Sequence, residues 1–269
     1  MKAEVTPHAA DWWNAGEFPH HMIPKIAELD VMSPVYRQGH SNLFAGLCHA
    51  EFTRADTSFA TFLGVHDGLF TGSIEALASE EQKAAWLPDI YSMKKIGAFG
   101  LTEPLGGSDV AGGTRTTARR DGDNWILNGE KRWIGNATFS DWVVIYARDV
   151  ADNQVKGFLD TKTKGYSATK IENKIALRTV QNADIVLDNV VVSDDFHLKA
   201  PTASRTPTRS SRSPDCPLPG RQWASRWQPL TLPASMRWSA TSSASRWLPS
   251  SWSRTSLSRS WATPLPRWA

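Results

Sequence analysis

The chain has 269 residues and a formal net charge of +3, and this length suits one large domain or two smaller ones. The positive charge lies after Ala200, where ten Arg accompany one acid, Asp215; without that tail, residues 1–200 hold 20 basic and 26 acidic residues, a net of −6. Two cysteines, Cys48 and Cys216, are too few for a disulfide framework or a metal-binding pattern, which favours a reducing compartment. No run of 18 apolar residues and no signal-peptide pattern occur, so the sequence predicts no membrane span.

Residues 1–92 have the apolar period of helices. Leu43 and Leu47 follow one another at a helical step, and an apolar stretch runs from residue 57 to 77. The segment 79–82, Ser-Glu-Glu-Gln, has the pattern of a helix N-cap followed by acids. These patterns predict a helical N-terminal domain.

The period changes from helix to strand after Lys94. Residues 125–134 predict two strands around an Asn128-Gly129 turn. Further strands are predicted at residues 142–147, 155–159 and 183–187. Short strands at close spacing predict a small antiparallel β-barrel or sandwich over residues 93–200, so the fold class is α+β with the helices first.

Residues 201–269 have neither period. Ser, Arg, Pro, Thr and Trp dominate this tail, which holds seven of the thirteen Trp, whereas disordered tails are poor in Trp. Read in a shifted frame with free codon choice, residues 203–216 can encode QQDTNKVLAVSRL and residues 248–263 can encode PFQLEQDKLVQVLGN. Both peptides are typical of helices, so we interpret the tail as frame-shifted and expect it to be unstructured.

Two blocks of residues carry a family resemblance. Residues 97–109, GAFGLTEPLGGSD, and residues 128–136, NGEKRWIGN, resemble the signatures of the acyl-CoA dehydrogenase and oxidase family, and residues 173–178, NKIALR, fit its later strands. The resemblance covers nearly all of residues 1–200, and the shifted-frame peptides resemble the family's C-terminal helices.

This resemblance implies a fold and a reaction. The family has a helical N-terminal domain, here residues 1–92, and a β-barrel middle domain, here residues 93–200. Its C-terminal helical bundle is missing from this chain, where residues 201–269 stand instead. The family removes an α-proton and a β-hydride from an acyl-CoA thioester, giving a trans-2-enoyl-CoA, and FAD takes the hydride.

The resemblance also implies which residues meet FAD. A flavin needs backbone donors along the edge that gains negative charge on reduction, and glycines let those donors approach. Most dehydrogenases of the family have Thr at position 135, so we expect Gly135 to leave the flavin N5 more open, a pointer to oxidase chemistry. The implied cofactor-binding residues are Phe99, Leu101, Thr102, Gly107, Ser108, Trp133, Ile134 and Gly135, with Ser108 at the FAD phosphate or the CoA portion of the substrate.

Other polar residues have simpler explanations. We expect Glu103 to be a structural acceptor and not the catalytic base. His66 is expected to be a satisfied core histidine, with the lining of the acyl pocket as the alternative. His20 and His21 lack a third ligand and predict no metal site. The resemblance places the catalytic Glu in the missing C-terminal bundle, so no catalytic residue is assigned in this chain.

Within the family, residues 133–136 are similar to plant peroxisomal short-chain acyl-CoA oxidases, and the chain also resembles glutaryl-CoA dehydrogenases. The expected location is therefore the peroxisome, with the mitochondrial matrix as the alternative. An acyl-CoA is the expected partner, without nucleic acid or membrane, and the family forms dimers or tetramers. Two further hypotheses are a non-catalytic remnant that binds no flavin and a nucleic-acid adaptor that uses the basic tail.

Overall fold

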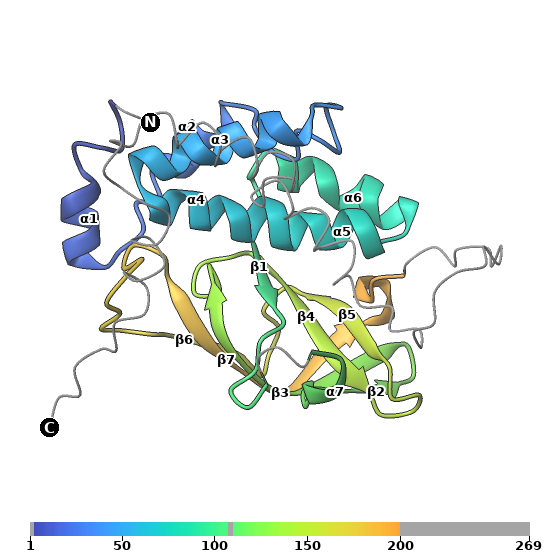
Figure 1. Cartoon of the computed structure of the whole chain (residues 1–269). Helices are drawn as coiled ribbons and strands as arrows, with labels where there is room; N and C mark the ends of the chain where they lie inside the picture. The colour runs from blue at the N-terminus through green and yellow to red at the C-terminus, as the bar shows by residue number, and fades with distance from the viewer. Residues whose placement is uncertain (1–2, 107–109, 200–269) are drawn as a thin grey trace, which may run out of the picture. The chain divides into compact units, whose positions relative to one another are not determined.

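A computed structural model describes residues 3–106 and 110–199. The expected unstructured tail, residues 201–269, and the expected ligands Gly107 and Ser108 lie outside the described residues. Figure 1 shows the described part as a layer of helices above a curved sheet.

The helices that precede the sheet in the chain lie between residues 9 and 91. The apolar stretch at residues 57–77 is one continuous helical run whose middle portion is a π-helix, η1. The predicted cap at residue 79 is confirmed, because the Ser79 hydroxyl accepts from the Gln82 amide and the Gln82 side chain accepts from the Ser79 amide. The elements are α1 Ala9–Ala15, α2 Met22–Ala27, α3 Asn42–Ala55, α4 Thr57–Leu63, η1 Gly64–Thr71, α5 Gly72–Leu77 and α6 Glu80–Tyr91.

The sheet has seven strands in the order β1-β4-β2-β3-β7-β6, with β5 paired to β4. A short helix, α7 (Val110–Gly113), precedes β2, and a 3-10 turn, η2 (Asp194–Phe196), follows β7. The strands are β1 Gly97–Gly100, β2 Thr117–Asp121, β3 Asn124–Gly135, β4 Trp142–Asp149, β5 Val155–Asp160, β6 Tyr166–Lys170 and β7 Asn182–Ser193.

The expected antiparallel pairing holds for most of the sheet and fails in two places. β1 pairs with β4 in parallel, and β2 pairs with β4 in parallel over two residues. The cause is the path of the chain. β2 runs in the same direction as β1, β3 returns in the hairpin, and β4 then runs in the direction of β1 and β2 again. The remaining pairings are antiparallel.

The predicted turn at Asn128-Gly129 is also wrong, because residues 124–135 form a single long strand. Gly129 lies instead at a register shift in the pairing with β7, and a Cβ there would come within 2.7 Å of Thr116. The real hairpin turn lies at Gly122-Asp123, where Asp121 pairs with Asn124. Gly122 has φ +60 and is the first central residue of this two-residue loop, a position that favours glycine, so the glycine of the hairpin turn lies seven residues before the predicted one, Gly129.

The helical run packs closely on the sheet because two glycines leave room for it. A Cβ on Gly97 would lie 1.9 Å from the Phe70 ring, and a Cβ on Gly135 would lie 2.9 Å from Val65. Phe70 and Val65 both belong to η1. Phe70 is also part of a buried cluster in which side chains of α5 and α6 pack against β4. Side chains of normal size at residues 97 and 135 would therefore push the two layers apart.

His66 joins the π-helix to two other elements. Its side chain is fully buried; Nδ1 accepts from the Gly97 amide at 3.0 Å, and Nε2 lies 3.2 Å from the Ile90 carbonyl oxygen. Because the Gly97 amide is a donor, Nε2 carries the proton and donates to Ile90. Burial lowers the pKa of His66 to about 4. The expectation of a satisfied core histidine is confirmed.

We expect Gly97→Ala to lower the free energy of unfolding by about 1–3 kcal/mol, the usual cost of overpacking, because the new methyl group overlaps the Phe70 ring. The matched control is Gly46→Ala in α3, where a Cβ meets no atom within 4 Å. Alanine is the better helix former, so this control should gain about 0.5–1 kcal/mol. Urea unfolding followed by circular dichroism measures both, and an unchanged midpoint for Gly97→Ala contradicts the packing described here.

We expect stability to fall as the pH drops from about 6.5 to about 4. The unfolded chain takes up a proton on His66 near pH 6.5, whereas the folded chain resists protonation down to about 4. The free energy of unfolding should therefore decrease by up to about 1.4 kcal/mol per pH unit in that window and keep its full value above it. His66→Gln, which retains one donor and one acceptor, should flatten the slope in urea titrations at successive pH values. The exposed control His21→Gln should retain it.

Candidate functional site

The two sequence blocks of the family signature meet in space. β1 ends at Gly100, and the loop that follows lies beside a register shift in β3 between Lys131 and Ile134. The Arg132 amide donates to the Thr102 carbonyl oxygen at 2.8 Å. Residues that are thirty positions apart in the chain therefore form one continuous piece of surface.

Trp133 is presented outward by this register shift. Its backbone has φ +62, a left-handed conformation that is costly for a bulky residue and is found mainly where function or packing demands it. The Asn182 side chain donates to the Trp133 carbonyl oxygen at 3.1 Å, and the Arg132 guanidinium lies 5.3 Å from the indole ring. The indole is nevertheless 54% exposed, so one broad aromatic face is open to a ligand.

The other expected ligands lie around this surface at different depths. Thr102 is half-buried, and its hydroxyl has no hydrogen-bond partner within the described ranges. Phe99 is half-buried with its ring edge against Tyr146, and Leu101 packs in the same cluster. Ile134 is 3% exposed and belongs to the core of the sheet, so its side chain supports the bulge from below.

Gly135 lies against the π-helix. The space that a side chain at this position would take is occupied by Val65 of η1, whose Cγ2 lies 2.9 Å from the Cβ position. The glycine is therefore needed for the approach of the π-helix. This contact accounts for the glycine without reference to a flavin, and an opening at N5 stays a prediction.

A buried ion pair lies directly beneath the surface. Lys131 and Glu103 are 2.7 Å apart and only 0% and 5% exposed. Burial lowers the pKa of Lys131 to about 8, with Glu103 opposing the shift. Burial works against the Glu103 charge as well, yet Lys131 and two backbone amides hold the pKa of Glu103 below its ordinary value. The expectation of a structural role for Glu103 is confirmed, whereas nothing in the sequence singled out Lys131 as its partner.

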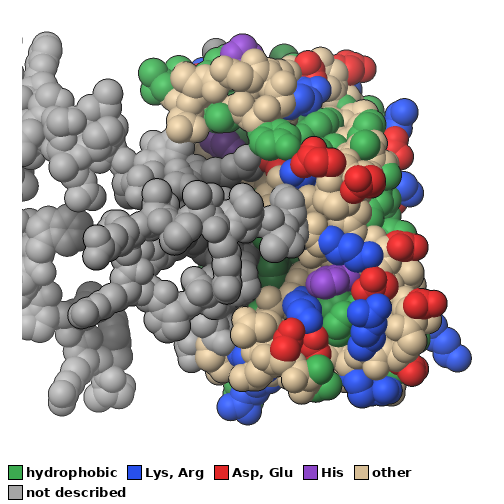
Figure 2. All heavy atoms as spheres, turned by 90° about the vertical axis from the view of Figure 1, so that its right-hand side faces the viewer, with side chains coloured by type: hydrophobic (Ala, Val, Ile, Leu, Met, Phe, Trp, Pro, Cys, Tyr) green, Lys and Arg blue, Asp and Glu red, His purple; other side chains and the backbone are tan. Residues whose placement is uncertain are grey.

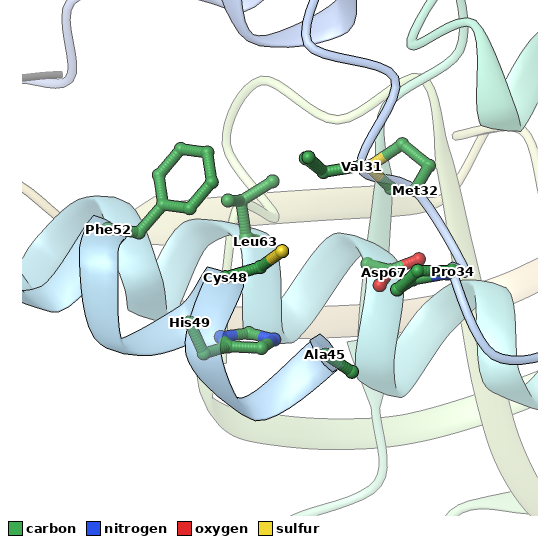
Figure 3. Close-up of a pocket in the computed structure, with 9 residues that line it drawn as sticks. All are labelled: Val31, Met32, Pro34, Ala45, Cys48, His49, Phe52, Leu63 and Asp67. Carbon is green, nitrogen blue, oxygen red and sulfur yellow. The ribbon is translucent and has the colours of Figure 1, made fainter. Parts of the chain in front are cut away.

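A separate small cavity lies among α3, η1 and the loop at residues 31–34 (Figure 3). It holds about 330 Å³ of empty space, part of it open to solvent, and its lining is mostly apolar. Cys48 and His49 reach it from α3. Burial raises the pKa of the Cys48 thiol and lowers the pKa of His49, so neither group is charged at neutral pH and the thiol is a poor nucleophile.

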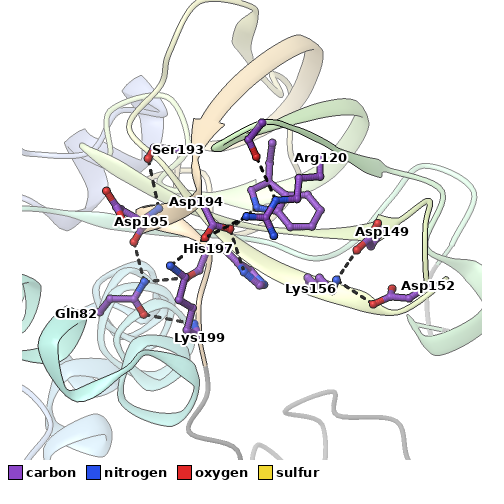
Figure 4. A network of polar contacts seen from close by, with 12 residues as sticks. Gln82, Arg120, Asp149, Asp152, Lys156, Ser193, Asp194, Asp195, His197 and Lys199 are labelled. Carbon is purple, nitrogen blue, oxygen red and sulfur yellow. Dashed lines mark hydrogen bonds and ion pairs between the residues drawn. The ribbon is translucent and has the colours of Figure 1, made fainter.

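A polar network joins α6 to the end of β7 (Figure 4). The Gln82 side chain donates to the carbonyl oxygens of Asp195 and His197, both at 2.7 Å. Asp194 accepts from the Trp125 indole at 2.8 Å and lies 3.1 Å from Lys199. Figure 2 shows cationic and anionic side chains interspersed on this side of the molecule, without a broad patch of one sign.

Residues 3–106 and 110–199 contain neither a metal-binding cluster nor a membrane-spanning helix. No group of three or more His, Cys, Asp or Glu side chains is arranged to hold a metal ion. No helix there has both the length and the apolar character needed to cross a membrane.

Comparison with known proteins assigns the family. The acyl-CoA dehydrogenase N-terminal domain matches residues 1–94, and the acyl-CoA dehydrogenase middle domain matches residues 98–190. The chain is 32% identical over 207 residues to the mitochondrial short-chain specific acyl-CoA dehydrogenase of Bos taurus, covering 74% of this chain and 50% of that protein.

Two solved structures are similar as well. Glutaryl-CoA dehydrogenase from Mycobacterium smegmatis, in complex with FADH2, is 35% identical with a TM-score of 0.70, covering 74% of this chain and 52% of that one. An acyl-CoA dehydrogenase from Bacillus anthracis complexed with FAD is 28% identical with a TM-score of 0.67, covering 73% of this chain and 35% of that one. The chain therefore belongs to the acyl-CoA dehydrogenase family, and it spans about half the length of the curated relatives it matches.

Proposed function

We propose that the protein is an FAD-dependent oxidoreductase that acts on short acyl-CoA thioesters, and that Thr102 and Trp133 hold one side of the flavin. The observation that carries this proposal is the hydrogen bond from the Arg132 amide to the Thr102 carbonyl oxygen, which brings both signature blocks together. An exposed indole face and the Thr102 hydroxyl suit a flat ring with a polar edge. FAD and FADH2 occupy the similar structures described above.

The reaction needs a base as well as a flavin. FAD, when bound, supplies an acceptor for the hydride that leaves the β-carbon. The α-proton of a thioester is weakly acidic, so its removal needs a carboxylate in a dry pocket. Glu103 does not fill this role, because Lys131 and two amides occupy its oxygens. We therefore assign the base to a segment outside the described residues.

Between dehydrogenase and oxidase we propose the dehydrogenase, with a location in the mitochondrial matrix. The Bos taurus relative is a mitochondrial enzyme by name, and the three relatives described above are all named dehydrogenases. The contact with Val65 accounts for Gly135 without an open N5. A version of the protein with a C-terminal helical bundle should transfer electrons to an artificial acceptor and consume little oxygen; rapid peroxide formation with butyryl-CoA would favour the oxidase.

We expect this 269-residue chain to bind FAD weakly and to turn over no acyl-CoA. Residues 201–269 contain no Glu and Glu103 is already engaged, so these 269 residues alone should not supply the proposed base. The test adds excess FAD to the chain and follows bleaching of the flavin absorbance by butyryl-CoA and glutaryl-CoA without oxygen. Bleaching at a rate comparable to a frame-corrected enzyme would show that the base lies within the chain.

We expect Trp133→Ala to weaken FAD binding by about 5- to 150-fold, because base-stacking contacts of an aromatic face are worth about 1–3 kcal/mol. Quenching of flavin fluorescence during titration measures the dissociation constant. Trp13→Ala is the matched control, since Trp13 is also exposed and also has an arginine, Arg178, over its ring. Equal affinities of the two variants would remove Trp133 from the flavin site.

A further inference from the structure

We propose that the buried Lys131–Glu103 pair positions the backbone of Leu101 and Thr102 beside Trp133, and so sets the geometry of the flavin edge. This inference rests on the proposed function, because it assigns a role to two residues beneath the same site. Neither side chain reaches the surface, so both act through the loop that they hold.

Lys131 uses all three of its ammonium hydrogens inside the protein. It donates to Glu103 at 2.7 Å, to the Tyr146 carbonyl oxygen at 2.7 Å and to the Leu101 carbonyl oxygen at 3.3 Å. These acceptors belong to the loop after β1 and to β4. One ammonium group therefore ties the loop to the middle of the sheet.

Glu103 connects the start of the segment between β1 and β2 to the end of that segment. Its two carboxylate oxygens accept from the Arg115 amide at 2.7 Å and from the Thr116 amide at 3.0 Å. These amides lie just before β2. A single carboxylate thus joins the two ends of the segment that connects β1 to β2, and the charge of Lys131 balances it.

The pair and the site are linked through consecutive residues. Leu101 is bonded to Lys131 through its carbonyl oxygen, and Thr102, the next residue, is bonded to the amide of Arg132, the next residue of β3. Two adjacent connections hold a strip of backbone in register, whereas one alone would let it pivot. Without the Lys131 ammonium, the hydrogen bond to Leu101 is lost and only the one between Arg132 and Thr102 remains.

Stability alone does not account for a buried ion pair at this place. Desolvation of two charges costs about as much as their attraction returns, and apolar residues of similar volume often replace such a pair without loss of stability. What an apolar pair cannot supply is the set of bonds to Leu101, Arg115 and Thr116. The geometry of the loop, and not the free energy of folding, is therefore what distinguishes the ion pair from an apolar filling.

The experiment compares the full chain with the double variant Lys131→Met/Glu103→Met. Three quantities are measured: the thermal midpoint, the hydrogen-exchange rate of the Arg132 amide without FAD, and the dissociation constant for FAD by fluorescence quenching. We expect a lower midpoint, because four backbone groups lose their partners. At a temperature where both proteins are folded, we expect Arg132 exchange at least tenfold faster and FAD binding at least tenfold weaker. The matched control is Lys156→Met/Asp149→Leu, which removes an ion pair that touches neither Leu101 nor Thr102 and should leave exchange and FAD binding unchanged.

A double variant with unchanged exchange and unchanged FAD affinity overturns the inference and leaves the proposed function intact. Failure of the unmodified chain to bind FAD at any concentration overturns both. If the double variant does not fold, Glu103→Gln, which keeps the size of the side chain, is measured by the same three criteria. Its oxygen can still accept from Lys131 and the Thr116 amide, whereas its nitrogen meets the Arg115 amide donor to donor, so exchange at Arg115 should also rise at least tenfold.

Discussion

The close contact between the π-helix and the sheet is the constraint on which the rest of the structure depends. Gly97 and Gly135 lack side chains at the two points where Phe70 and Val65 arrive from η1. His66, which lies between Val65 and Phe70 in the chain, accepts from the Gly97 amide. This hydrogen bond fixes the distance between η1 and β1. The helical layer and the sheet are therefore held in one register, and the end of β1 is placed within reach of β3.

That placement explains why the site is built where β1 stops. A strand that ends beside a register shift exposes backbone groups that a regular ladder would use. Here Thr102 and Arg132 satisfy one another, and Trp133, in its left-handed conformation, is turned outward. The ion pair beneath them supplies charge and hydrogen bonds without reaching solvent. Rigid backbone below and an open aromatic face above are what binding a flat cofactor requires.

Under the proposed function, the described residues supply only part of a catalytic site. We propose that the surface at Thr102 and Trp133 holds a ring, yet the acid beneath it, Glu103, is already paired with Lys131. The chain spans about half the length of the curated relatives it matches. A carboxylate committed to an ammonium and two amides is stabilised as an anion, which suits support of a loop and not proton abstraction. Proton removal therefore calls for a second element facing this surface.

The sequence by itself determined the family, the order of helices before strands and the cap at Ser79, because each depends on local pattern or on short blocks of characteristic residues. It also indicated that Glu103 is structural and that His66 is satisfied in the core. The tertiary structure decided the rest: that Gly129 marks a register shift and not a turn, that Lys131 is the partner of Glu103, and that Val65 fills the space at Gly135. The physical reason is distance along the chain. Lys131 and Glu103 are 28 positions apart, and only the pairing of strands and the packing of η1 on the sheet bring such residues together.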